Sequence, residues 1–224
     1  MKPTADRTMR RDADAIRYIV LRKLASGLRH TMMGELQTIQ FLAELGARKV
    51  DDGAAGVAKT REFIGKISIA AGESIATCHS VIEWLRPERG AVTTLAEAVG
   101  QCVKLAGDDW RMRATQATIE MPAAAGEAKV SKSAARELIV TTVLTLTDLH
   151  PGSLDIDIVG ALAGDRVDLR LRALPSKRAP PLPSSVVYHS LDWDDIACLA
   201  AAHDVTWTRA NGSSTLSFAV VRPR

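Results

Sequence analysis

Long apolar runs are missing from this sequence, and so is an apolar leader. No stretch of about eighteen consecutive apolar residues occurs, which is what a membrane-spanning helix requires. Residues 1–7 are polar and lack the apolar centre of a signal peptide. We therefore expect a soluble, cytoplasmic protein that has no membrane partner.

Cysteine is scarce as well. The three cysteines, Cys78, Cys102 and Cys198, lie far apart in the sequence, and each falls inside an apolar helical pattern. This arrangement is typical of reduced, buried thiols with a structural role. It predicts neither a disulfide framework nor a zinc cluster.

An excess of one charge is almost absent. The formal net charge is +3, and much of the surplus lies near the two ends of the chain. Nucleic-acid-binding proteins usually show a clustered basic face with aromatic or groove-entering elements, so we expect no nucleic acid partner. The Gly-x-Ser-x-Gly elbow is missing too, which argues against a hydrolase of the Ser-His-Asp type.

Four of the five histidines give no sign of a site. None of the four has metal-ligand spacing with another histidine, a cysteine or an acidic residue, so no metal site is expected. His203 ends a predicted helix, where a cation suits the helix dipole. The four are His79, His150, His189 and His203.

What the sequence does contain is a strong helical pattern in its first third. Residues 12–46 hold no proline and carry apolar residues at steps of three and four, until Gly46 and Gly53 mark a break. A second helix follows and ends before Pro87. The first apolar stripe comprises Leu21, Leu24, Leu28, Met32, Leu36, Ile39 and Ala43, and the second Ile64, Ile67, Ala71, Ile75, Cys78, Ile82 and Leu85.

Two such helices form an antiparallel hairpin that cannot bury all of its apolar surface alone. Pairing two hairpins into a four-helix bundle covers this surface, so we expect a homodimer. We predict three regions: a flexible basic N-terminus over residues 1–11, the helical hairpin over 12–88, and a second domain over 93–224.

The second domain has the pattern of an α/β sandwich, which makes the chain α+β overall. The order helix, strand, helix, two strands, loop, helix, two strands predicts helices layered on one face of a mixed sheet. Ser131 is the expected N-cap of the long central helix. The predicted elements are helices over 94–105, 131–149 and 192–202, strands over 117–121, 154–159, 167–171, 205–208 and 215–221, and a proline-rich loop over 175–183.

His30 stands out within the first helix. It lies two residues after Leu28, and at about 100° per residue it turns roughly 200° away from the apolar stripe. An exposed imidazole on a rigid helix is available as a nucleophile, a metal ligand or a proton carrier, although most single surface histidines have no such role. The surrounding architecture decides between these interpretations.

A dimerising hairpin with an exposed histidine, followed by an α/β sandwich of this order, resembles the transmitter region of a bacterial sensor histidine kinase. The resemblance covers nearly the whole chain after about residue 12. It implies a dimerisation and histidine phosphotransfer hairpin followed by a degenerate ATPase-like domain. His30, Leu36 and Ile39 match the histidine and the hydrophobic framework of the family's first-helix motif.

The chemical neighbours of His30 depart from that motif. Thr31 replaces the acidic residue that would accept a proton during autophosphorylation. Gly34 replaces the residue that helps to place a hydrolytic water, and Glu35 lies about 100° further round the helix, so we do not expect it to act as a base.

The nucleotide-binding motifs of the family are missing as well. The resemblance places Thr142 and Leu146 where asparagines would hold Mg²⁺, and a leucine cannot ligate a hard cation. Residues 172–183 contain neither the aspartate nor the glycines that would receive adenine. We therefore expect no nucleotide cofactor and no resident metal.

The resemblance then implies a histidine phosphotransferase in a phosphorelay. His30 would accept a phosphoryl group from one receiver aspartate and pass it to another, with Arg29 as an auxiliary and with Mg²⁺ supplied by the receiver. The expected partners are response-regulator receiver domains and a hybrid histidine kinase. Two alternatives stay open at this point: a non-catalytic, pseudokinase-like scaffold or inhibitor, and a working kinase with an unusual nucleotide pocket.

Overall fold

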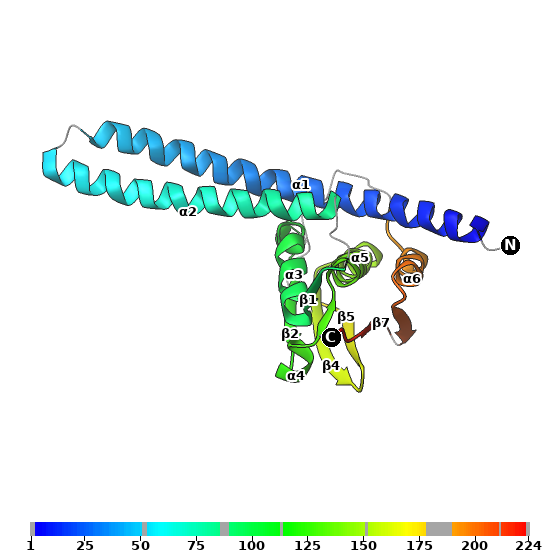
Figure 1. Ribbon diagram of the computed structural model, residues 1–224. Coiled ribbons are helices and arrows are strands. Elements are labelled where there is room, and N and C mark those ends of the chain that lie inside the picture. Colours follow the sequence, from blue (N-terminus) through cyan, green and yellow to red (C-terminus); the bar gives the residue numbers. More distant parts are fainter. Residues whose placement is uncertain are drawn as a thin grey trace. The chain divides into compact units, whose positions relative to one another are not determined.

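The protein consists of a helical part and an α/β part, shown in Figure 1 as a computed structural model. The structure describes residues 3–50, 53–85, 90–112, 114–150, 152–177, 190–210 and 212–222. The chain divides into two compact units, one formed by Ala25–Pro87 and the other by Met1–Leu24 together with Glu88–Arg224. Among the helices of the described residues, none has the length and apolar content needed to cross a membrane.

The first unit is an antiparallel pair made by α1 (Pro3–Lys49), from Ala25 onward, and α2 (Gly53–Leu85). Helix α1 begins at Pro3 rather than at residue 12, so residues 3–11, predicted as a flexible tail, are helical. Proline is well tolerated in the first turn of a helix, and these polar residues carry no apolar stripe that could have predicted one. Gly53, with a φ of +67°, follows the connection between the helices.

Residues spaced in heptads form the seam between α1 and α2. The Ser74 hydroxyl donates to Glu35 Oε2 over 2.8 Å, and the Thr60 hydroxyl donates to the Gly46 carbonyl over 3.3 Å, which fixes the register. The seam residues are buried or half-buried. They are Leu28, Met32, Glu35, Ile39, Leu42 and Gly46 on α1, and Gly56, Thr60, Phe63, Ile67, Ala70 and Ser74 on α2.

A second line of large apolar side chains on the hairpin is left uncovered in the single chain. We name it the outer apolar stripe. Its members are Leu36, Val50, Val57, Ile64, Ile75 and Ile82, each between 49% and 60% exposed. On α2 the four members lie within about 40° of one another around the helix. The expectation that one hairpin cannot bury all its apolar surface is therefore confirmed, because Leu36, Ile64, Ile75 and Ile82 of the predicted stripes belong to this line.

The second unit is built on a mixed five-stranded sheet of order β2-β4-β5-β7-β6. Strand β2 runs parallel to β4, and the other neighbours are antiparallel. The strands are β2 (Gln116–Glu120), β4 (Leu154–Ala163), β5 (Arg166–Pro175), β6 (Thr206–Ala210) and β7 (Ser213–Ala219). Three short elements were not predicted: β1 (Val92–Thr94), β3 (Lys129–Ser131), which pairs with β1, and α4 (Ala123–Gly126).

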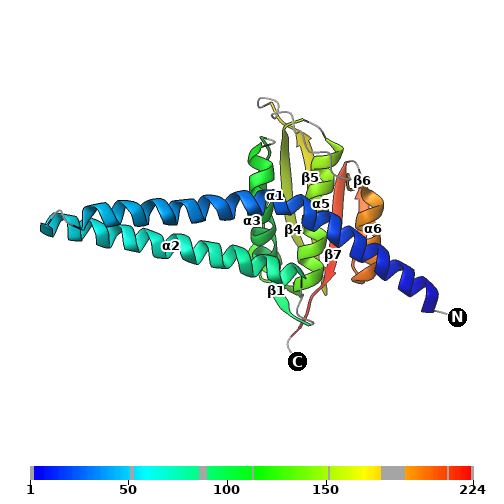
Figure 2. The same ribbon diagram turned by 90° about the horizontal axis from the view of Figure 1, so that it is seen from above.

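Three helices cover one face of this sheet, as predicted: α3 (Leu95–Met112), α5 (Lys132–Leu149) and α6 (Trp193–Ala202) (Figure 2). The Ser131 side chain caps α5 by accepting from the Ala134 amide, and Asp192 forms a capping box with Asp195 at the start of α6. Because side chains alternate between the two faces of each strand, every second side chain points into the core. These include Ile156, Ile158, Val167, Leu169, Leu171, Leu216 and Phe218.

The N-terminal part of α1 packs on this second unit rather than on the hairpin. We name residues 13–24 the covering segment. Its side chains Ala13, Ile16, Val20 and Leu24 are each at most 5% exposed. The segment lies over α5 and α6 (Figure 2). The boundary between the two units falls after Leu24, whereas the hairpin was predicted to begin at residue 12. An apolar stripe in the sequence predicts that a helix is packed, but it does not show which part of the protein the helix packs against.

Candidate functional site

His30 is exposed on α1, as the helical spacing predicted. The seam residues Leu28 and Met32 lie on the other side of the helix, so the imidazole points away from α2. Arg29, next along the helix, is exposed as well. Both proposed site residues are therefore accessible on the hairpin.

No acidic side chain is bonded to the imidazole. Within the described part of the chain, neither His30 nor Arg29 has a hydrogen bond or an ion pair to another side chain. Glu35 turns toward the seam and accepts from Ser74, as expected for a residue about 100° from the position of Gly34. A Cβ at Gly34 would meet nothing within 4 Å, so the surface next to His30 is open.

The outer face that carries His30 continues along α1. Gln37 and Phe41 lie about 20° from His30 around the helix axis. Both are exposed, and the Phe41 side chain is 61% exposed. This face therefore combines an accessible imidazole with a large apolar side chain two to three turns away.

The two positions on α5 that correspond to metal-binding asparagines in the resemblance are closed. Thr142 and Leu146 are both 0% exposed, and the Thr142 hydroxyl has no hydrogen-bond partner. Residues 172–183 were predicted to lack the adenine-binding motif of the family. Those up to Lys177 belong to β5 and its end, and residues 178–183 lie outside the described residues.

The described part of the chain contains no cluster of three or more histidine, cysteine or acidic side chains that could hold a metal ion. Cys102 is fully buried, and burial raises the pKa of its thiol to about 12, which makes it unreactive. Cys78 and Cys198 form no disulfide within the described residues and are half-buried rather than buried, which corrects the expectation of buried thiols for these two.

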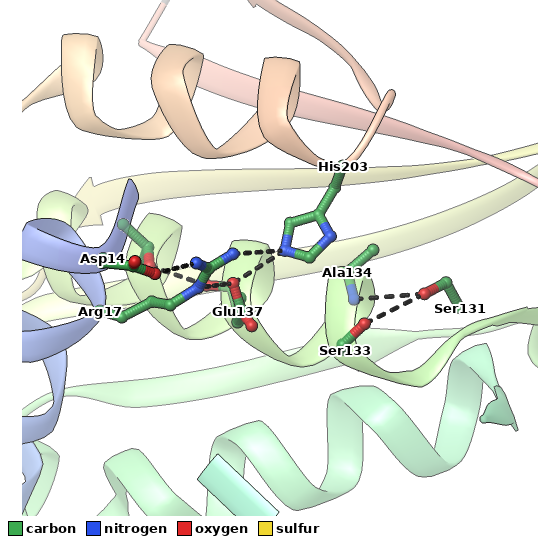
Figure 3. A network of polar contacts seen from close by, with 8 residues as sticks. Asp14, Arg17, Ser131, Ser133, Ala134, Glu137 and His203 are labelled. Atoms are coloured by element: carbon green, nitrogen blue, oxygen red, sulfur yellow. Dashed lines mark hydrogen bonds and ion pairs between the residues drawn. The ribbon is translucent and has the colours of Figure 1, made fainter. Parts of the chain in front are cut away.

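A buried ionic cluster in the second unit was not predicted (Figure 3). Glu137 of α5 is 5% exposed, and its Oε2 accepts from Arg17 Nε at 2.7 Å and lies 2.8 Å from His203 Nε2. Burial alone would raise the pKa of the Glu137 carboxyl, but its bonds and charge interactions with His203 and Arg17 outweigh burial and hold the pKa below its ordinary value. Arg17 also binds Asp14, one turn earlier on α1, at 2.6 Å.

A second carboxylate repeats this arrangement at the other end of α5. Asp148 Oδ2 lies 2.8 Å from Lys23 Nζ of the covering segment. The same oxygen accepts from the Leu191 amide, just before α6, at 2.9 Å. Each carboxylate therefore joins the covering segment to one end of α6.

Sequence reasoning had only faint signals for these clusters. His203 does follow the last residue of α6, as expected. Its ring contacts the Glu137 carboxylate as well as lying near the C-terminal end of the helix dipole. Arg136 and Glu137 are the only charged residues between Ser133 and Thr147 of α5, which is a local sign of buried ionic partners. The partners themselves are 120 and 66 residues away in sequence.

No protein-family model and no curated protein matches the sequence. Solved structures similar to it include the Acinetobacter baumannii histidine kinase AdeS, at 8% identity over 83% of this chain and 96% of that one, with a TM-score of 0.42. A bacterial phosphotransferase aligns at 14% identity over 88% of this chain and 95% of its own, with a TM-score of 0.39. The histidine kinase ThkA in complex with the response regulator TrrA aligns at 12% identity over 98% and 67%, with a TM-score of 0.42. The predicted α+β fold, a helical hairpin followed by an α/β sandwich, is confirmed by the structure itself, and the likeness to these histidine kinase-like chains is one of fold alone.

Proposed function

We propose that the protein is a histidine phosphotransferase of a two-component phosphorelay. His30 accepts a phosphoryl group from the aspartate of one receiver domain and passes it to the aspartate of another. The protein does this without binding ATP. The observation that carries the proposal is the exposed His30 on the outer face of the hairpin, to which no acidic side chain of the described residues is bonded.

The chemistry asks little of the histidine beyond accessibility. One ring nitrogen of the neutral imidazole attacks phosphorus with its lone pair, and a P–N bond forms as the P–O bond to the receiver aspartate breaks. The bonding electrons leave with the aspartate carboxylate, while the other ring nitrogen keeps its proton. Transfer to the second receiver reverses these steps, and the Mg²⁺ that stabilises the moving group comes from the receiver. Thr31 in place of an acid is compatible with this route.

The interior of α5 supports the absence of nucleotide binding. Thr142 and Leu146 are enclosed in the core, so their side chains present no oxygen to a Mg²⁺–phosphate group. A nucleotide would need other ligands, and the described residues offer no cluster of acidic, histidine or cysteine ligands in their place.

The outer apolar stripe supports a homodimer. Six large apolar side chains on one side of a two-helix unit are more than an isolated hairpin normally leaves in water. Packing two copies along this stripe gives a four-helix bundle in which His30, on a different face, remains exposed. Receiver domains, including that of a hybrid histidine kinase, would then contact the outer face that carries His30 and Phe41.

Label transfer tests the proposal. Response-regulator receivers from the source organism are phosphorylated with labelled acetyl phosphate, purified, and mixed with the protein. We expect label on the wild-type protein from at least one receiver, and no label from ATP. His30→Ala abolishes the labelling. His79→Ala is the matched control, because His79 is also an exposed histidine of the hairpin, and it leaves the labelling intact.

Three outcomes would contradict the proposal. Label that survives His30→Ala would place the acceptor elsewhere. Label that never transfers, although a receiver binds the protein, would favour the scaffold function instead. Magnesium-dependent binding of ATP at micromolar concentration would restore the kinase alternative.

A further inference from the structure

The ionic contacts of the covering segment are arranged in an unusual way: of the four charged groups that pair across the interface, Arg17, Glu137 and Asp148 also have a partner on their own side. If residues 13–24 left the second unit, Arg17 would keep Asp14 on the same helix. Glu137 would keep His203, and Asp148 would keep the Leu191 amide. Separation therefore leaves neither buried carboxylate without a partner, which is the usual cost of breaking a buried ion pair.

A core between α5 and the sheet lies beneath the covering segment. Helix α5 packs on the sheet through residues that point away from Glu137 and Asp148, which lie within about 20° of each other around α5. Leu138, Leu146, Ile156, Leu169 and Phe218 are each at most 1% exposed within this core. The covering segment adds a separate layer held by four apolar side chains and two charged contacts.

We propose that the covering segment is a detachable cover, an intramolecular contact that closes the outer face of α5 and α6. In the covered state this face is occupied by the chain itself. In the released state it presents an apolar groove flanked by Glu137 and Asp148, which fits an amphipathic helix with two basic residues six apart. The covering segment is such a helix, with Arg17 and Lys23 at that spacing. This inference concerns the second unit and is independent of phosphotransfer.

Cys198 provides a native probe for release. It is half-buried on α6, and its thiol feels the charges of Asp12 and Arg17 on α1 as well as that of Asp195. Cys102 lies in the core of the same unit and is 0% exposed. A thiol reagent read out by peptide mass spectrometry therefore reports the cover at Cys198 and the core at Cys102.

The experiment uses Val20→Asp in the full chain, because Val20 is 0% exposed and a carboxylate there opposes both burial and the acidic residues of α5. Tyr18→Asp, at a position that is 61% exposed on the same segment, is the matched control. We expect Val20→Asp to label Cys198 about tenfold faster than wild type, as for a local opening, with Cys102 still protected. The control labels like wild type.

A peptide in trans completes the test. A fluorescent peptide of residues 10–26 is expected to bind the Val20→Asp protein and restore the slow labelling of Cys198, but not to bind wild type. Labelling of Cys102 together with Cys198, or a Val20→Asp protein that does not fold, would overturn the proposal by showing that the segment is part of the core. The milder Val20→Ala then serves as a second check, since a cover gives faster labelling at Cys198 alone. Failure of the peptide to bind a folded Val20→Asp protein would also overturn it.

Discussion

At the scale of single residues, His30 differs from the histidines that serve the structure. The His203 ring contacts Glu137, and His150 Nδ1 lies 2.9 Å from the Leu146 carbonyl oxygen. His30 has no such bond within the described residues. A side chain that must exchange a group with an outside protein has to be free of internal partners, and this is the physical distinction between the two kinds of histidine here.

Arg29 is expected to assist phosphotransfer without being essential for it. A guanidinium beside His30 attracts the acidic site of a receiver and the moving phosphoryl group. We expect Arg29→Ala to slow label transfer about two- to tenfold at low salt, with the difference shrinking as ionic strength rises. Rates from single-turnover transfer at several salt concentrations measure this effect. Arg61→Ala, at an exposed arginine of α2, is the control, and equal rates for the two variants would remove Arg29 from the site.

At the scale of elements, the hairpin has two rows of apolar side chains, the seam and the outer apolar stripe, which make different contacts. The seam joins α1 to α2 within one chain, whereas the outer apolar stripe is left for another surface. The two lines are about 100° apart, as seen for Phe63 in the seam and Ile64 in the stripe. Because of this separation, a substitution in the outer apolar stripe can test dimerisation without disturbing the seam.

Ile75→Glu is expected to convert the proposed dimer into monomers. A carboxylate at this position would be buried in the dimer interface without a partner, whereas in the single chain Ile75 is 59% exposed and the substitution leaves the hairpin intact. Light scattering during size-exclusion chromatography should show the mass fall from two chains to one. Ile69→Glu is the control, because Ile69 is 65% exposed on a different side of α2, and this variant should remain dimeric. A wild-type protein that is monomeric at micromolar concentration would contradict the bundle.

The sequence predicted the long elements and the features set by local spacing, but not the short elements or the contacts between residues far apart in the chain. Strands β4 and β5 were predicted because residues 154–159 and 167–171 alternate clearly, although both strands extend further, and α5 because Ser131 marks its start. Strands β1 and β3 have three residues each, too few for a period to show. The exposure of His30 followed from helical spacing alone. The pairing of Glu137 with Arg17 and His203 did not, because contacts so distant in sequence leave no local pattern.

At the scale of the whole molecule, Glu137 links stability to pH. The pKa of its carboxyl in the folded protein is below the ordinary 4.5. Its contribution is therefore complete above about pH 4.5, and it is lost as the pH falls through the lower folded value. We expect Glu137→Gln to reduce the free energy of unfolding by about 1–3 kcal/mol at pH 7, typical of hydrogen bonds to charged groups.

Denaturant unfolding at several pH values checks this expectation. The difference between wild type and Glu137→Gln should shrink steadily below pH 4.5. Glu97→Gln is a useful comparison, since Glu97 is bonded by the exposed Thr94 backbone amide and the Thr93 hydroxyl and has no part in the buried cluster. A difference for Glu137→Gln that stays constant down to pH 3 would show that the carboxyl is not held in its charged form by Arg17 and His203.

The partner-keeping contacts around the covering segment also fix how temperature acts on it. Because both buried carboxylates keep a partner whether or not the segment is in place, burial of the four apolar side chains contributes strongly to the balance between the two states. Burial of apolar surface weakens on cooling. Residues 13–24 should therefore loosen in the cold while the sheet beneath stays folded, so that a chilled sample samples the uncovered face more often than a warm one.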